Sequence, residues 1–143
     1  MTTSTIAPPP AATLSPLRLN LMRVGYLILG GGLAVVKWPT LLHAEDWTLM
    51  GGVVTSMLVA LSVLALLGLR HPLAMLPVLL FELLWKAIWL GFAALPTWID
   101  GTTDAGTAGV ARDCAFVVVI ALVIPWDHVY RKYLAGPGDP WRR

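Results

Sequence analysis

The segment around which the chain is organised is PLAMLPVLLFELLWKAIWLGFAAL, residues 72–95, an apolar run that contains one acid and one base. Glu82 and Lys86 are four residues apart, so on a helix they lie one turn apart on the same face. The run is long enough to cross the roughly 30 Å hydrocarbon core of a bilayer as a helix. Because a charge in hydrocarbon is costly, such a pair is a candidate functional site.

The composition of the 143 residues indicates a membrane protein. Hydrophobic residues make up 57% of the chain, charged residues make up 13%, and the mean hydropathy is +0.75. A soluble domain carries about 25% charged residues, so this chain has too few to cover a surface that faces water. The basic residues lie near the chain ends and in one short turn, which reflects membrane topology and argues against nucleic acid as a partner.

Four apolar segments predict an all-α polytopic membrane protein with four transmembrane helices in an antiparallel bundle. We expect these helices at residues 17–38, 47–69, 72–95 and 110–130. They form a transmembrane domain over residues 17–132. A disordered N-terminal tail is expected at residues 1–16, and a basic C-terminal tail at residues 133–143.

The sequence leaves open where the fourth helix begins. Its uncharged run from Cys114 to Trp126 is too short to span, so the helix must begin near Val110. Arg112 and Asp113 are then expected at one headgroup layer. Whether these two charged residues lie inside the span stays open at this stage.

Small residues predict faces at which helices pack closely. Gly30 and Ala34 lie four residues apart on the first helix, and Gly52, Ser56 and Ala60 repeat at the same spacing on the second. Small side chains let helix backbones approach each other in a membrane. These faces suit packing within the bundle, a homo-oligomer or a membrane-protein partner.

The expected intramembrane polar site consists of Glu82, Lys86, Trp85 and Ser56. Antiparallel second and third helices, counted from their shared turn at about 1.5 Å per residue, bring Ser56 near the depth of Trp85 and Lys86. Pro77 is expected to kink the third helix one turn before Glu82. The acid–base pair could fix the rotation of its helix, dock a charged helix of a partner, or handle a proton or a polar substrate.

No other motif predicts chemistry, and we expect no metal, no cofactor and no enzymatic activity. The single cysteine, Cys114, excludes an intrachain disulfide, and Asp100 and Asp104 fall far short of a calcium loop. No Ser-His-Asp or Gly-x-Ser-x-Gly pattern occurs. Haem bound between His71 and His128 would make a redox enzyme, but interfacial histidines are the favoured interpretation.

The distribution of basic residues predicts the orientation. With four spans, both termini and the turn at Arg70 share one side, which holds seven of the ten Lys and Arg residues. The other side holds Lys37 and Arg112. Because basic residues are retained on the cytoplasmic side, both termini should be cytoplasmic in a multi-pass protein of the bilayer.

Parts of the chain resemble known membrane proteins. The glycine-rich first helix, Leu17 to Lys37, which ends on lysine, together with the four-span layout, is similar to DoxX-type small membrane proteins. The stretches Val35–Pro39, Leu79–Lys86 and Gly138–Arg142 resemble small four-span bacterial proteins of unassigned function. This resemblance implies the bacterial inner membrane and implies no activity.

The sequence therefore predicts a non-enzymatic accessory or scaffold protein of the membrane. The alternative is a small transporter or proton-linked carrier that uses the Glu82–Lys86 pair.

Overall fold

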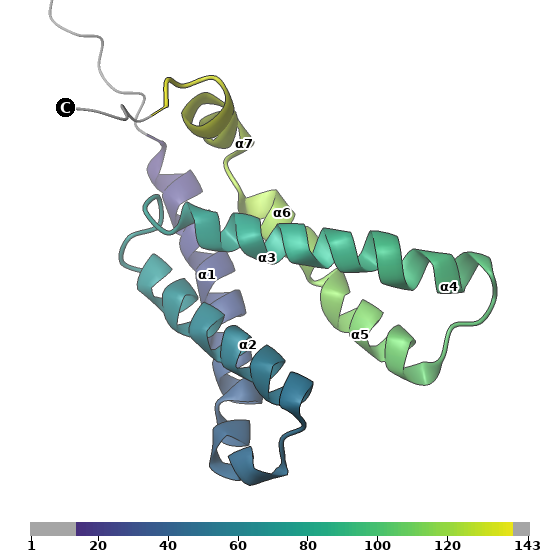
Figure 1. Ribbon diagram of the computed structural model, residues 1–143. Coiled ribbons are helices and arrows are strands. Elements are labelled where there is room, and N and C mark those ends of the chain that lie inside the picture. The colour runs from purple at the N-terminus through teal and green to yellow at the C-terminus, as the bar shows by residue number, and fades with distance from the viewer. Residues whose placement is uncertain (1–13, 139–143) are drawn as a thin grey trace, which may run out of the picture.

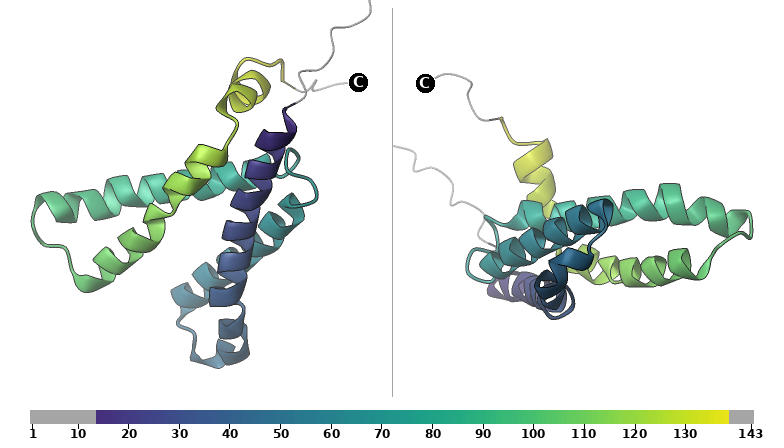
Figure 2. Two further views of the ribbon diagram at one scale, coloured as in Figure 1. Left: turned by 180° about the vertical axis from the view of Figure 1, so that it is seen from behind. Right: turned by 60° about the horizontal axis from the view of Figure 1, so that its bottom comes forward.

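All secondary-structure elements in residues 14–138, which the computed structural model describes, are helices (Figure 1). Four helical segments are long and apolar enough to cross a membrane: Pro16–Lys37, Leu49–Gly68, Leu76–Ile99 and Ala105–Val123. The predicted all-α fold with four helices able to span a membrane is therefore confirmed, but the four helices form two diverging hairpins and not one antiparallel bundle (Figure 2). Residues 1–13 and 139–143, which hold most of the predicted N-terminal tail and five of the eleven residues of the predicted C-terminal tail, lie outside the described residues.

The first two spans form an antiparallel hairpin. Helix α1 (Pro16–Lys37) is followed by a 3-10 segment, η1 (Pro39–Asp46), and by helix α2 (Leu49–Gly68). The Ser15 hydroxyl caps the start of α1, and the Thr48 hydroxyl caps the start of α2. Such caps satisfy backbone N–H groups that have no partner within their own helix. The predicted bounds of both helices hold to within two residues.

The last two spans form a second hairpin. The third span consists of α3 (Leu76–Trp89), a π-helical turn η2 (Leu90–Ala94) and α4 (Leu95–Ile99). The fourth span consists of α5 (Ala105–Ala115) and α6 (Val117–Val123). Short turns thus connect long apolar helices, as antiparallel neighbours require.

Two prolines lie in the first turn of a helical segment and do not break it. The predicted kink at Pro77 is wrong, because α3 begins at Leu76 and Pro77 therefore occupies its first turn. A proline there removes no helical hydrogen bond. Pro96 lies in the first turn of α4, directly after η2, so the third span continues past its predicted end at residue 95.

The fourth span is displaced toward the N-terminus from its predicted range, 110–130. The turn before it uses Gly101 with a positive φ of 67°, a conformation that favours glycine. Asp104 then caps α5, so the helix begins at Ala105. The span ends at Val123, and the chain continues into two short helical turns, α7 (Trp126–Val129) and η3 (Tyr130–Leu134).

The two hairpins meet at the end that carries the turn between α2 and α3, and they diverge from there (Figure 2). The buried core lies at this junction and draws on α1, α2, α3, α6 and α7. It consists of Met22, Tyr26, Leu29, Leu61, Ala65, Leu76, Leu79, Ile120, Ile124 and Val129. An ion pair of 2.9 Å between Arg18 and Asp127 links the start of α1 to α7.

Candidate functional site

Glu82 and Lys86 form an ion pair within one turn of α3. The Lys86 Nζ lies 2.7 Å from Oε1 of Glu82. The indole Nε1–H of Trp85 donates to the other carboxylate oxygen, Oε2, at 2.7 Å. The Lys86 Nζ also lies 5.6 Å from the centroid of the Trp85 ring, within range of a cation–π interaction. One helix therefore supplies a cation and a hydrogen-bond donor to its own buried acid.

This pair faces the fourth span. Glu82 is only 1% exposed and lies on the buried face of α3 with Leu76 and Leu79. Helix α3 packs on α6, and the buried thiol of Cys114 on α5 lies within electrostatic range of both Lys86 and Glu82. The side chain of Lys86 keeps 13% of its surface exposed. The Glu82 carboxylate is thus buried, whereas part of the Lys86 side chain is exposed.

Chemically, the arrangement is an ion pair with both acid oxygens occupied. A buried pair of this kind compensates its own charge, and removal of one partner would leave the other uncompensated. A proton path would need further acids that face the pair at intermediate depths. Neither α1 nor α2 contains a carboxylate, and Asp113 of the fourth span is exposed, whereas Glu82 is buried. The geometry favours a pair that fixes how α3 faces the fourth span.

The structure brings Trp85 to the predicted site but does not bring Ser56 there. Ser56 is exposed on α2, because α3 leaves α2 after their shared turn and packs on the fourth span. Cys114 takes the neighbouring position. Sequence reasoning missed Cys114 because it began the fourth helix near Val110, five residues too late, and so gave the wrong depth for this cysteine.

The predicted packing face of α1 lies at the first hairpin interface. Gly30 is buried, and a Cβ added there would lie 3.0 Å from Leu66 of α2. The hydroxyl of Ser62 donates a hydrogen bond of 2.7 Å to the Gly30 carbonyl. Ala34, one turn further, is half-buried. Ser62 was not predicted, although its spacing of four residues from Leu58 and Leu66 places it on the same face.

The predicted small-residue face of α2 lies at the surface of the chain. Ser56 and Ala60 are exposed, and Gly52 is half-buried beside the ring of Trp47. The three residues therefore do not form the contact with α1. This face is available to another helix in the membrane.

Two charged residues of the fourth span are exposed. Arg112 and Asp113 are the eighth and ninth of the 19 residues in Ala105–Val123, so they lie within one turn of the middle of the span. Neither forms an ion pair with any residue in the part of the chain that the structure describes. Because Asp104 caps the helix at Ala105, five residues before its predicted start, the two charges lie well inside the helix and not at its beginning.

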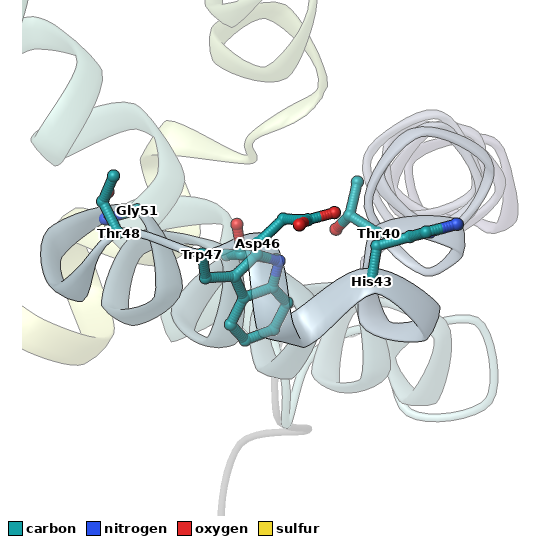
Figure 3. A pocket seen from close by; sticks show the side chains of 7 residues that line it. Thr40, His43, Asp46, Trp47, Thr48 and Gly51 are labelled. Atoms are coloured by element: carbon teal, nitrogen blue, oxygen red, sulfur yellow. The ribbon is translucent and has the colours of Figure 1, made fainter.

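A shallow depression of about 400 Å³ lies at the opposite end of the first hairpin (Figure 3). It is lined by Thr40, His43, Asp46, Trp47, Thr48, Gly51 and Thr55. The Asp46 carboxylate points toward Thr40, whereas the His43 ring points away from the Asp46 carboxylate (Figure 3). Across residues 14–138, no group of three His, Cys, Asp or Glu side chains is arranged to hold a metal ion.

Two titratable groups outside the spans have shifted pKa values. Burial lowers the pKa of His128, and the nearby cations Lys132 and Arg131 lower it further. Hydrogen bonds from the Thr107 hydroxyl and backbone N–H lower the pKa of Asp104. His128 lies in α7, and Asp104 is the N-cap of α5.

No protein-family model, curated protein or solved structure matches the chain. The resemblance to DoxX-type and other small four-span bacterial proteins therefore stays a prediction.

Proposed function

We propose that the protein is a non-enzymatic accessory or scaffold component of the bacterial inner membrane that works by binding other transmembrane helices. The observation that carries this proposal is the exposure of Arg112 and Asp113 near the middle of a span. A charged side chain at the centre of a bilayer costs about 2.5 to 3.5 kcal/mol. Contact with another protein removes this cost, whereas contact with lipid tails does not.

Two further features support association. The small-residue face of α2 (Gly52, Ser56 and Ala60) allows close approach of another helix. The Glu82–Lys86 pair is satisfied within its own helix and so needs no external counter-ion. Arg112 and Asp113, near the middle of the fourth span, form no ion pair with any residue in the part of the chain that the structure describes.

The proposed orientation places both termini in the cytoplasm, in agreement with the excess of basic residues on that side. Contacts at one end of the molecule support a shared side for the start of α1, the turn between α2 and α3, and α7. Arg18 near the start of α1 pairs with Asp127, and the guanidinium of Arg23 donates to the carbonyl of Leu69 in the turn between α2 and α3. The first helix, the turn and α7 thus lie together (Figure 1).

The test is extraction of the full-length tagged protein with its native lipids, followed by quantification of every polypeptide that co-purifies. We expect at least one stoichiometric partner chain, and we expect the Arg112→Leu/Asp113→Leu variant to lose it. Val118→Leu, an exposed apolar substitution on α6, is the control and should retain it. Wild-type particles that contain a single copy of this chain and no other polypeptide would overturn the proposal, whereas a second copy of this chain counts as a partner.

A carrier that uses the Glu82–Lys86 pair is the second candidate, favoured by the partial exposure of Lys86. Purified protein in liposomes would then conduct protons or a substrate, and Glu82→Gln would abolish the flux. Trp85→Phe removes a hydrogen bond but no titratable group, so it is the matched control. Under the association proposal, all three proteins show the same background flux.

A further inference from the structure

The outward side of the fourth span forms one continuous face. Successive helical residues are about 100° apart, and the buried residues of α5, Ala111 and Cys114, lie on the side that faces the third span. The opposite side is the outer face of α5. It consists of Ala105, Gly109, Arg112 and Asp113, together with Phe116, the residue that directly follows α5.

The centre of this outer face is shaped for close helix contact. Ala105 and Gly109 are four residues apart, the small-residue spacing that lets two membrane helices approach closely. A Cβ added at Gly109 would meet no atom within 4 Å, so no part of the described chain fills this space. Phe116, 64% exposed, extends the face by one apolar side chain beyond the charges.

The charges on the outer face are self-complementary. Arg112 and Asp113 lie on opposite sides of the line through Ala105, Gly109 and Phe116, because adjacent helical residues differ by about 100°. In a dimer whose two-fold axis is parallel to the helix, the Arg112 side of one copy faces the Asp113 side of the other copy. Arg112 of one copy then lies opposite Asp113 of the other, at nearly the same depth.

We propose that a second copy of this chain covers the outer face of α5, in a two-fold dimer held by reciprocal Arg112–Asp113 ion pairs. The inference rests on the proposed function, and it goes further by naming the occupant. An anionic lipid headgroup could pair with Arg112 through its long side chain, but it would repel Asp113. A second copy neutralises both charges and presents the small residues needed for close approach.

The sharpest test uses charge reversal in two differently tagged full-length copies that are expressed together in one membrane. Wild-type copies should co-purify. R112D places acids at both positions of the contact, and D113R places bases at both. Each variant should lose self-association by about tenfold or more, because two ion pairs become two like-charge contacts. The R112D chain should, however, co-purify with the D113R chain, because every facing pair is then complementary. The R112D/D113R double variant should self-associate as the wild type does.

Disulfide trapping tests the same contact with the wild-type charges intact. In a Cys114→Ala background, Phe116→Cys should form a dimer under mild oxidation, because the two-fold axis brings this position close to its own copy. Ile88→Cys, which is 52% exposed near the middle of the third span, is the control of similar depth and should stay monomeric. This arm remains decisive if a charge-reversed chain fails to insert.

The outcomes separate the two proposals. Self-association of both single variants at the wild-type level, or failure of the R112D and D113R chains to pair with each other although both insert, overturns the dimer. If a different polypeptide is then found bound to the wild-type chain and lost from Arg112→Leu/Asp113→Leu, the proposed function survives without the dimer. If neither a second copy nor any other chain is bound, both proposals fail.

Discussion

The hydroxyl of Ser62 on α2 donates a buried hydrogen bond of 2.7 Å to the backbone carbonyl of Gly30 on α1. Gly30 lies so close to α2 that an added Cβ would be 3.0 Å from the backbone nitrogen of Leu66. The close approach makes the hydrogen bond reachable for the short serine side chain. A small residue on one helix and a hydroxyl on the other thus lock the register of the first hairpin.

Loss of this bond should destabilise the hairpin measurably. Ser62→Ala is expected to lower the free energy of unfolding by about 1 kcal/mol, the usual size of a hydrogen bond between membrane helices. Unfolding by a denaturing detergent would measure it. Ser56→Ala removes an exposed hydroxyl from the same helix and should leave stability unchanged. Equal effects of the two substitutions would contradict the assigned role of Ser62.

Gly68 should be intolerant of any side chain. A Cβ there would lie 2.5 Å from the ring of Tyr26, which is fully buried and whose hydroxyl donates to the Pro72 carbonyl at 2.8 Å. Gly68→Ala is expected to cost about 1 to 3 kcal/mol through overpacking. Gly32→Ala is the control, since a Cβ at Gly32 meets nothing within 4 Å. Thermal unfolding in detergent would separate the two variants.

The Glu82–Lys86 pair should behave as a unit. Lys86→Met leaves a buried carboxylate without its cation, and the expected loss is about 3 to 5 kcal/mol. Glu82→Gln with Lys86→Met removes both charges and should restore much of the stability, because no charge remains uncompensated. A double-mutant cycle measures this coupling. Additive effects of the two substitutions would show that the ion pair does not hold α3 against the fourth span.

Stability should fall on mild acidification because of His128. Its pKa is lowered in the folded protein, so below the ordinary value of about 6.5 the unfolded chain binds a proton that the folded chain does not. The free energy of unfolding therefore decreases as the pH falls through 6.5 toward the folded pKa. It does not change further below that pKa. Unfolding midpoints measured between pH 7.5 and pH 5 would show the slope, and His128→Phe should flatten it.

The control for this effect is His71→Gln. His71 is exposed in the turn between α2 and α3. Its substitution should leave the pH dependence in place, whereas a flattened slope in this variant would contradict the assignment to His128.

The sequence predicts the number, class and antiparallel order of the spans because hydrophobic length alone limits what can cross a bilayer. The bounds of the first two helices are predicted most accurately for the same reason. The fourth is misplaced because Gly106, Gly109 and the charges at Arg112 and Asp113 lower its apolar character. The available signal was local, since Asp104 and Thr107 form a cap three residues apart, and a cap fixes where a helix begins.

The candidate site is predictable only in part. The pairing of Glu82 with Lys86 follows from helical spacing, and the structure contains that contact. The neighbour of the pair does not follow from the sequence. Depth counting along antiparallel helices gives the level of Ser56 but not the direction in which α3 leaves α2, so it could not identify the fourth span and Cys114 as the facing surface.

We propose that this chain functions in contact with other transmembrane helices. The most direct measurement is native mass spectrometry of the full-length protein released from its own membrane without prior delipidation. We expect particles whose mass requires this chain and at least one further polypeptide, either a second copy or another protein. Particles that contain a single copy of this 143-residue chain and lipid alone would contradict it.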